Sequence, residues 1–168
     1  MGKAEEITAY IPRLRRYARA LTGNRDAADD LVQDTLERAW SRFHLWRHGS
    51  NLRAWLFTIM HNLFINDTRT RNRESGFAPE EEAFALPVSP AHDALVELRE
   101  LDAALRQLPD EQREVVLLVG LEQMSYGDAA RVLGIPPGTV MSRLSRGRER
   151  LRNLMYGKAS VSQLKVVK

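Results

Sequence analysis

The chain has 168 residues, no cysteine, and a formal net charge of only +3 at pH 7, from 25 Lys and Arg against 22 Asp and Glu. The lack of cysteine excludes disulfides, thiolate zinc sites and thiol catalysis. No apolar run approaches the roughly 20 residues of a membrane-spanning helix, and the polar N-terminus lacks the apolar core of a signal peptide. We therefore expect a cytoplasmic protein with no membrane insertion.

The charges are segregated along the chain rather than mixed. Acidic residues gather at 26–37 and 80–82, whereas arginines gather at 69–73 and 143–152. Such segregation predicts two different partner surfaces, of which the basic one suits nucleic acid.

The first half of the chain reads as three helices. Apolar side chains recur with helical spacing over 4–22, over 25–43 and from Leu52 to about residue 72. Gly23 ends the first helix, and Asn24 is a plausible N-cap for the second. Ordinary core packing is expected for Trp40 and Trp55. Trp46 lies in a predicted loop from His44 to Asn51, where the pattern does not decide its role.

Residues 73–93 have the composition of a flexible linker. They hold three glutamates in a row, a glycine and three prolines, and they show little periodicity. We therefore expect a first domain at 1–72 and a second at 94–156. The tail at 157–168 has no clear pattern and is expected to be mobile.

The second half is helical again. Leucines at helical spacing mark a helix from Leu95 to Leu105, and Val115–Leu121 indicates a deeply buried one. A Ser-x-x-Asp capping signal opens a short helix from Ser125 to Leu133. Pro136-Pro137 can start a last helix running to about Tyr156. The predicted fold class is all-α, with two small helical domains joined by a flexible linker.

The segment from Ser125 to Arg152 has the pattern of a helix-turn-helix. Ala129 and Ala130 are small where two helices approach, and Gly134 can adopt the positive φ of the turn. The last helix has a buried stripe and an arginine-rich outer face. A solvated basic face is the bland interpretation, but the basic charge together with the motif favours DNA contact.

At these residues the chain resembles the extracytoplasmic-function (ECF) sigma factors. Asp26-x-Ala28-x-Asp30-Leu31-Val32-Gln33-Asp34-Thr35-Leu36 is similar to the segment that binds the polymerase clamp. Asn51-Leu52-Arg53-Ala54-Trp55-Leu56-Phe57-Thr58-Ile59, followed by Asn62, is similar to the promoter-melting helix. Tyr126-x-x-Ala129-Ala130-x-x-Leu133-Gly134-Ile135-Pro136-x-Gly138-Thr139-Val140-x-Ser142-Arg143 is similar to the C-terminal promoter-binding domain. These motifs, in the family's order, cover nearly the whole chain outside the linker and tail.

The resemblance implies a sigma factor that directs promoter-specific initiation, with core RNA polymerase, promoter DNA and an anti-sigma factor as partners. It implies no enzymatic activity, no cofactor and no metal. The implied polymerase-binding residues are Asp30, Leu31, Gln33, Asp34 and Glu37. The implied minus-10 contacts are Arg53, Thr58, His61, Asn62, Ile65 and Arg69. The implied minus-35 contacts are Thr139, Met141, Ser142, Arg143, Ser145, Arg146 and Arg148. Met141 stands where the family often has a polar or basic residue, so an unusual minus-35 sequence is expected.

Three other functions compete with this interpretation. A metal enzyme would draw on His44 and His48, but no third ligand lies nearby in sequence, and zinc normally needs three or four. A stand-alone helix-turn-helix repressor would need neither the acidic stripe of 26–37 nor a base-capturing face. A sigma mimic that sequesters an anti-sigma factor would be expected to lose the basic side chains of the last helix, which this chain keeps. From charge alone the acidic stripe would be solvated surface, and the resemblance favours docking.

Overall fold

The computed structural model describes residues 2–74 and 92–166, with the side chains of 2–70 and 93–157, and these residues are all-α, as predicted. The first half contains α1 (Lys3–Thr8), α2 (Ile11–Thr22), α3 (Arg25–Ser41), the short 3-10 turn η1 (Phe43–Leu45) and α4 (Leu52–Glu74). The second half contains α5 (His92–Arg106), α6 (Asp110–Val116), the π-helical turn η2 (Leu117–Leu121), α7 (Tyr126–Leu133) and α8 (Pro137–Val166). Most of the predicted linker, 75–91, lies outside the described residues.

The helix predicted over 4–22 is two helices, α1 and α2. Pro12 lies in the first turn of α2, has no N–H to donate to Thr8, and its ring would clash with that carbonyl in a continuous helix. The chain therefore ends one helix at Thr8 and starts another at Ile11. The prediction of a single helix was wrong because it weighed apolar spacing above the proline.

The predicted caps are present. Asn24 Oδ1 accepts a hydrogen bond from Ala27 N at 2.9 Å and opens α3. Ser125 Oγ accepts from Asp128 N at 3.1 Å and opens α7. Gly23 and Gly134 end α2 and α7 with φ of 68° and 65°, a conformation that glycine adopts without strain.

A single connected core runs through both halves. Leu14 of α2 and Leu56, Phe57 and Met60 of α4 are at most 1% exposed, and Tyr17 meets Phe57 edge-on with ring centroids 5.0 Å apart. In the second half, Leu118, Val115 and Val140 are fully buried. Each such side chain contributes about 1.5–3 kcal/mol by leaving water.

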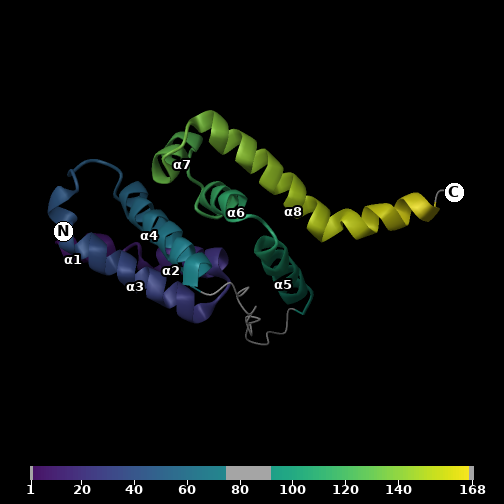
Figure 1. Ribbon diagram of the computed structural model, residues 1–168, viewed down its shortest axis with the longest axis horizontal. Helices are drawn as coiled ribbons and strands as arrows, with labels where there is room; N and C mark the ends of the chain where they lie inside the picture. Colours follow the sequence, from purple (N-terminus) through teal and green to yellow (C-terminus); the bar gives the residue numbers. More distant parts are fainter. Residues whose placement is uncertain (1, 75–91, 167–168) are drawn as a thin grey trace.

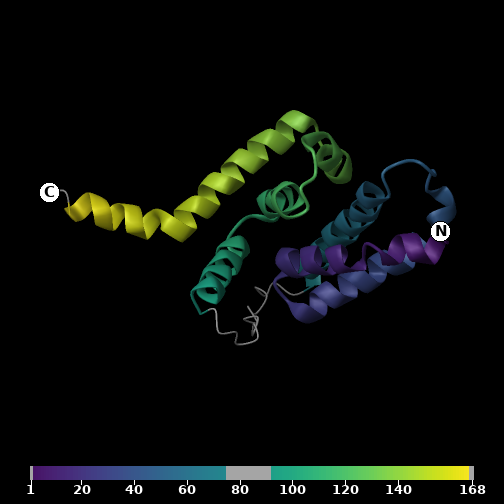
Figure 2. The same cartoon turned by 180° about the vertical axis from the view of Figure 1, so that it is seen from behind.

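The two halves pack against each other. Helix α4 contacts α7, and α2 contacts both η2 and α5. Figures 1 and 2 show the second half beside α4 from both sides, and they show the C-terminal part of α8 extending away from the body. The side chains of α4 predicted to meet DNA therefore lie near the second half.

Two expectations need correction. Trp40 is 52% exposed rather than buried, with the Lys3 ammonium 4.7 Å from its ring centroid. This cation–π contact stabilises an exposed tryptophan by about 0.5–1 kcal/mol. Trp55 is only half-buried and packs against the core.

The last helix does not end near Tyr156, because α8 continues to Val166 through most of the predicted tail.

Candidate nucleic-acid interface

Helices α7 and α8 form the predicted helix-turn-helix. Ala129 and Ala130 are buried where the helices meet, and the turn closes through Ile135 N, which donates to Ala130 O at 3.1 Å. Val140 and Leu144 of α8 are 0% and 3% exposed, so the predicted stripe faces the core. The opposite face of α8 is consequently held outward on a rigid helix.

The outer face of α8 carries most of the residues proposed for the minus-35 element. Met141 is 48% exposed, and Ser145, Arg146 and Arg148 are also exposed. Thr139 and Ser142 are half-buried, and Ser142 Oγ donates to Thr139 O at 3.1 Å. Arg143 turns inward, with its side chain 26% exposed and Nη2 3.7 Å from Glu111 Oε2. Within this set, Met141, Ser145, Arg146 and Arg148 are therefore exposed, whereas Arg143 is paired with Glu111.

Gly147 is a packing residue that sequence reasoning missed. A Cβ at this position would lie 2.7 Å from Val116 Cγ2 and 3.4 Å from Gln112 Cβ. Its lack of a side chain lets α8 cross closely over α6. The sequence signal for this close packing is a glycine in the interior of an arginine-rich helix.

The proposed minus-10 residues all lie on α4, and only some of them are turned toward the second half. His61 is nearly buried, with its side chain 10% exposed, and Thr58 and Ile65 are half-buried. Asn62 and Arg69 are exposed. Arg53, at the start of α4, donates from Nη1 to Glu122 O of the second half at 3.0 Å. The second half therefore covers His61 and binds Arg53, whereas Asn62 and Arg69 stay exposed.

A cavity of ≈ 330 Å³ lies between α4 and the second half. His61, Ile65 and Arg69 line it from α4, and Glu114 and Arg143 line it from α6 and α8, among others. Residues proposed for the minus-10 and minus-35 contacts thus meet in one hollow, although they are far apart in the sequence.

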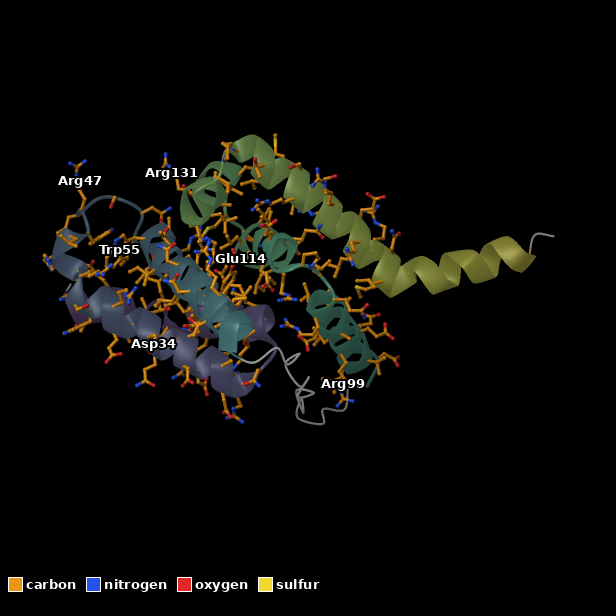
Figure 3. All side chains as sticks on the ribbon, viewed as in Figure 1. Asp34, Arg47, Trp55, Arg99, Glu114 and Arg131 are labelled. Carbon is orange, nitrogen blue, oxygen red and sulfur yellow. The ribbon has the colours of Figure 1, made fainter. Side chains whose placement is uncertain are left out.

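The acidic stripe of α3 faces outward. Asp30, Gln33, Asp34 and Glu37 are all exposed, and Figure 3 shows Asp34 on the side of α3 away from the second half. Leu31 is 3% exposed and belongs to the core. The four polar residues can meet a partner, whereas Leu31 offers it almost no surface in this arrangement.

The loop between α3 and α4 contains an aromatic cluster. Phe43 and Trp46 have ring centroids 5.3 Å apart, and Trp46 lies 4.9 Å from His48. Trp46 is half-buried, and its Nε1 is a buried donor with no hydrogen-bond partner. These contacts place Trp46 in a packed loop at the N-terminal end of α4.

A row of polar contacts joins the two halves, and sequence reasoning missed it. His61 Nδ1 lies 2.6 Å from Glu114 Oε2, close but not aligned as a hydrogen bond. Arg16 Nη2 lies 3.4 Å from Glu122 Oε1, a carboxylate whose side chain is 1% exposed. Asn51 Nδ2 donates to Asp128 Oδ2 at 3.2 Å.

Burial shapes the electrostatics of this row. Burial raises the pKa of Glu114, and the contact with His61 partly offsets that rise. Burial also raises the pKa of Tyr17 well above its usual value, and the carboxylates of Glu114 and Glu122 add to the shift. Glu114 and Glu122 flank a segment that the sequence predicts only as apolar core, so nothing in the pattern singled them out.

Arginines from the second half cap the end of α2. Arg106 Nη1 donates to Leu21 O at 3.0 Å, and Arg106 also donates to Ala20 O. Arg113, 8% exposed, reaches Leu21 O at 3.3 Å. A helix C-terminus carries unpaired carbonyls and partial negative charge, which suits these cations.

Within 2–74 and 92–166, no three His, Cys, Asp or Glu side chains lie together as a metal site would require. In the same residues, no helix has the length and apolarity to cross a membrane.

Comparison with known proteins follows the same division of the chain. Residues 7–61 match the family model described as the Sigma2 domain of PhyR, and residues 98–151 match that of Sigma-70, region 4. The ECF RNA polymerase sigma factor EcfG of Rhodopseudomonas palustris is 47% identical, over 90% of this chain and 84% of the relative. The ECF RNA polymerase sigma factor SigM of Bacillus subtilis is 32% identical, over 86% of this chain and 90% of the relative.

A solved structure has the same fold across nearly the same span. The sigma factor RpoE of Bartonella quintana, in complex with the anti-sigma factor NepR, superposes with a TM-score of 0.78 at 40% identity, covering 89% of this chain and 94% of RpoE. These relatives favour the sigma-factor function over a stand-alone repressor or a mimic. The chain belongs to the ECF RNA polymerase sigma factors.

Proposed function

We propose that this sigma factor binds core RNA polymerase in the cytoplasm and directs initiation at promoters through the particular residues described above. Residues 1–72 form the domain that docks on core and captures minus-10 bases, and residues 94–156 form the domain that binds the minus-35 element. Residues 73–93 connect them. The protein acts by binding alone, without a catalytic step of its own.

The observation that carries the proposal is the outer face of α8. A helix-turn-helix presents its second helix to the major groove, where arginine reads guanine and short polar side chains allow close approach. Arg146, Arg148 and Ser145 are free for this role. Met141 adds an apolar contact, which suits a thymine methyl group.

The minus-10 proposal rests on the face of α4. Unstacking a base costs a few kcal/mol, which a pocket with hydrogen-bonding and stacking groups can offset. Asn62 and Thr58 supply hydrogen bonds, and the aromatic loop around Trp46 lies at the N-terminal end of the same helix. Arg53 and Arg69 suit phosphates.

The polymerase-docking proposal rests on the exposed part of the α3 stripe. Asp30, Gln33, Asp34 and Glu37 present acceptors and negative charge on one helix face. Such a face suits a basic partner helix and speeds its association. Leu31 is not included, because its side chain is buried in the core.

An anti-sigma factor completes the proposed set of partners. The similar RpoE of Bartonella quintana is bound to the anti-sigma factor NepR. A comparable partner for this chain would bind it in competition with core polymerase.

Promoter binding by the reconstituted holoenzyme tests the assignment residue by residue. Arg146→Ala should weaken binding by about 1–3 kcal/mol at promoters that carry its base and much less at promoters altered there. Arg99→Ala, an exposed arginine of α5, is the matched control and should change nothing. Equal binding by Arg146→Ala and the parent on every promoter would remove Arg146 from the interface.

A further inference from the structure

The second half covers part of the surface of α4 that is proposed to capture the minus-10 strand. His61 is nearly buried, Thr58 and Ile65 are half-buried, and Arg53 is bonded to the backbone of Glu122. Asn62 remains exposed. Unstacked bases and this covering cannot occupy the same face at the same time.

We propose that the His61–Glu114 pair is an internal latch, which holds α6 and α7 over α4 in the free protein and must open before the minus-10 strand can bind. This inference rests on the proposed function of α4. The proposed latch is a contact within the chain itself. It would compete with DNA even when no anti-sigma factor is bound.

The position of Glu114 supports a competing role. Its carboxylate lies 2.6 Å from His61, and the two side chains are 5% and 10% exposed. The Glu114 side chain therefore occupies the place beside His61 that a DNA strand would approach. As long as it lies there, His61 cannot contact a base.

The groups around the pair strengthen the same arrangement. Arg69 of α4 and Arg143 of α8 line the cavity with it, as do Asp110 and Glu111 of α6. Arg143 lies 3.7 Å from Glu111. The closed state therefore brings three residues of the proposed minus-10 set, His61, Ile65 and Arg69, to one cavity with Arg143 of the proposed minus-35 set.

The character of the interface supports reversible opening. The contacts between the halves include the close approach of His61 to Glu114, the Arg16–Glu122 ion pair, and hydrogen bonds to Glu122 O and Asp128. Burying these carboxylates costs desolvation energy, which opening returns. Polar contacts between domains resemble those of transient complexes, for which relative motion is the default expectation.

The first arm of the test measures the opening itself. The chain has no cysteine, so Arg13→Cys on α2 and Arg152→Cys on α8 provide the only thiols for a donor and acceptor dye. Glu114→Gln keeps the shape but removes the carboxyl group that lies 2.6 Å from His61, so the open population should rise about tenfold. Glu97→Gln, an exposed carboxylate of α5, is the control. Equal energy transfer in Glu114→Gln and the control would overturn the latch.

The second arm locks the closed state and does not depend on how well Glu114→Gln folds. Asn51→Cys and Asp128→Cys face each other across the interface, where the natural side chains are 3.2 Å apart, and neither belongs to a proposed binding set. A reducible linker between these thiols should abolish promoter opening with core polymerase, and reduction should restore it. Full activity of the linked protein would overturn the latch and leave the proposed function intact. If neither the reduced protein nor the parent supports initiation, the result counts against the proposed function itself.

Discussion

Replacing Arg113 tests how the second half is held together. This arginine is 8% exposed and lies at the junction of α5, α6 and the end of α2. Its guanidinium donates to Leu105 O at 2.7 Å, Leu108 O at 2.8 Å, Arg106 O at 3.0 Å, Asp110 Oδ1 at 3.0 Å and Leu21 O at 3.3 Å. Arg106 O and Leu108 O, at and just after the end of α5, take their hydrogen bonds from this guanidinium. Leu105 O also accepts from Leu108 N, and Leu21 O also accepts from Arg106.

The expected loss follows from these contacts. Arg113→Met has a similar stem but no donors, and each buried carbonyl left without a partner costs about 1–3 kcal/mol. Water entering the site and the relief of burying a charge offset part of this cost. We expect the free energy of unfolding to fall by about 3–5 kcal/mol, the range for removing one partner of a buried ionic network. This is a large fraction of the 5–15 kcal/mol that typically stabilises a domain.

Urea unfolding followed by circular dichroism measures this loss directly. Arg131→Met is the control, because the Arg131 side chain is 79% exposed and its contact with Asp128 spans 3.9 Å. The control should change stability by less than about 0.5 kcal/mol. A loss below about 1 kcal/mol for Arg113→Met would refute the reasoning, since it would mean that the carbonyls do not depend on this side chain.

Three further predictions concern stability and DNA binding. Burial raises the pKa of Tyr17, so its contribution to stability is complete below the usual tyrosine pKa of 10.0 and is lost as the pH rises beyond it. Tyr17→Phe should flatten this alkaline decline in the free energy of unfolding, and parallel curves would contradict the assignment. Gly147→Ala should destabilise the protein by about 1 kcal/mol in urea, because overpacking against α6 outweighs the gain in helix propensity. Gly138→Ala, with nothing within 4 Å of the added Cβ, should show no such loss. Arg148→Ala should reduce the salt dependence of promoter binding by about one ion if it contacts a phosphate, and an unchanged slope would exclude that contact.

Local signals in the sequence predicted most of the fold. Asn24, Gly23, Ser125 and Gly134 act through hydrogen bonds or φ angles within a few residues, so their roles could be read without tertiary information. The break that Pro12 imposes between α1 and α2 is equally local, so it too can be predicted from the sequence.

Contacts between distant segments could not be predicted in this way. The exposed face of α8 was expected from periodicity, but the inward turn of Arg143 depends on Glu111, a helix away. The spacing of Trp40 predicts a core position, whereas its ring is exposed and contacts Lys3 of another helix. The pairing of His61 with Glu114 depends on how the halves pack, which no periodicity encodes.

Run-off transcription with core RNA polymerase and a library of promoter fragments tests the central claim most directly. The account predicts start-specific transcripts only when the protein is present, and it predicts that Arg146→Ala loses them selectively at promoters that carry its base. Absence of transcripts, together with tight binding of duplex DNA by the protein alone, would contradict it.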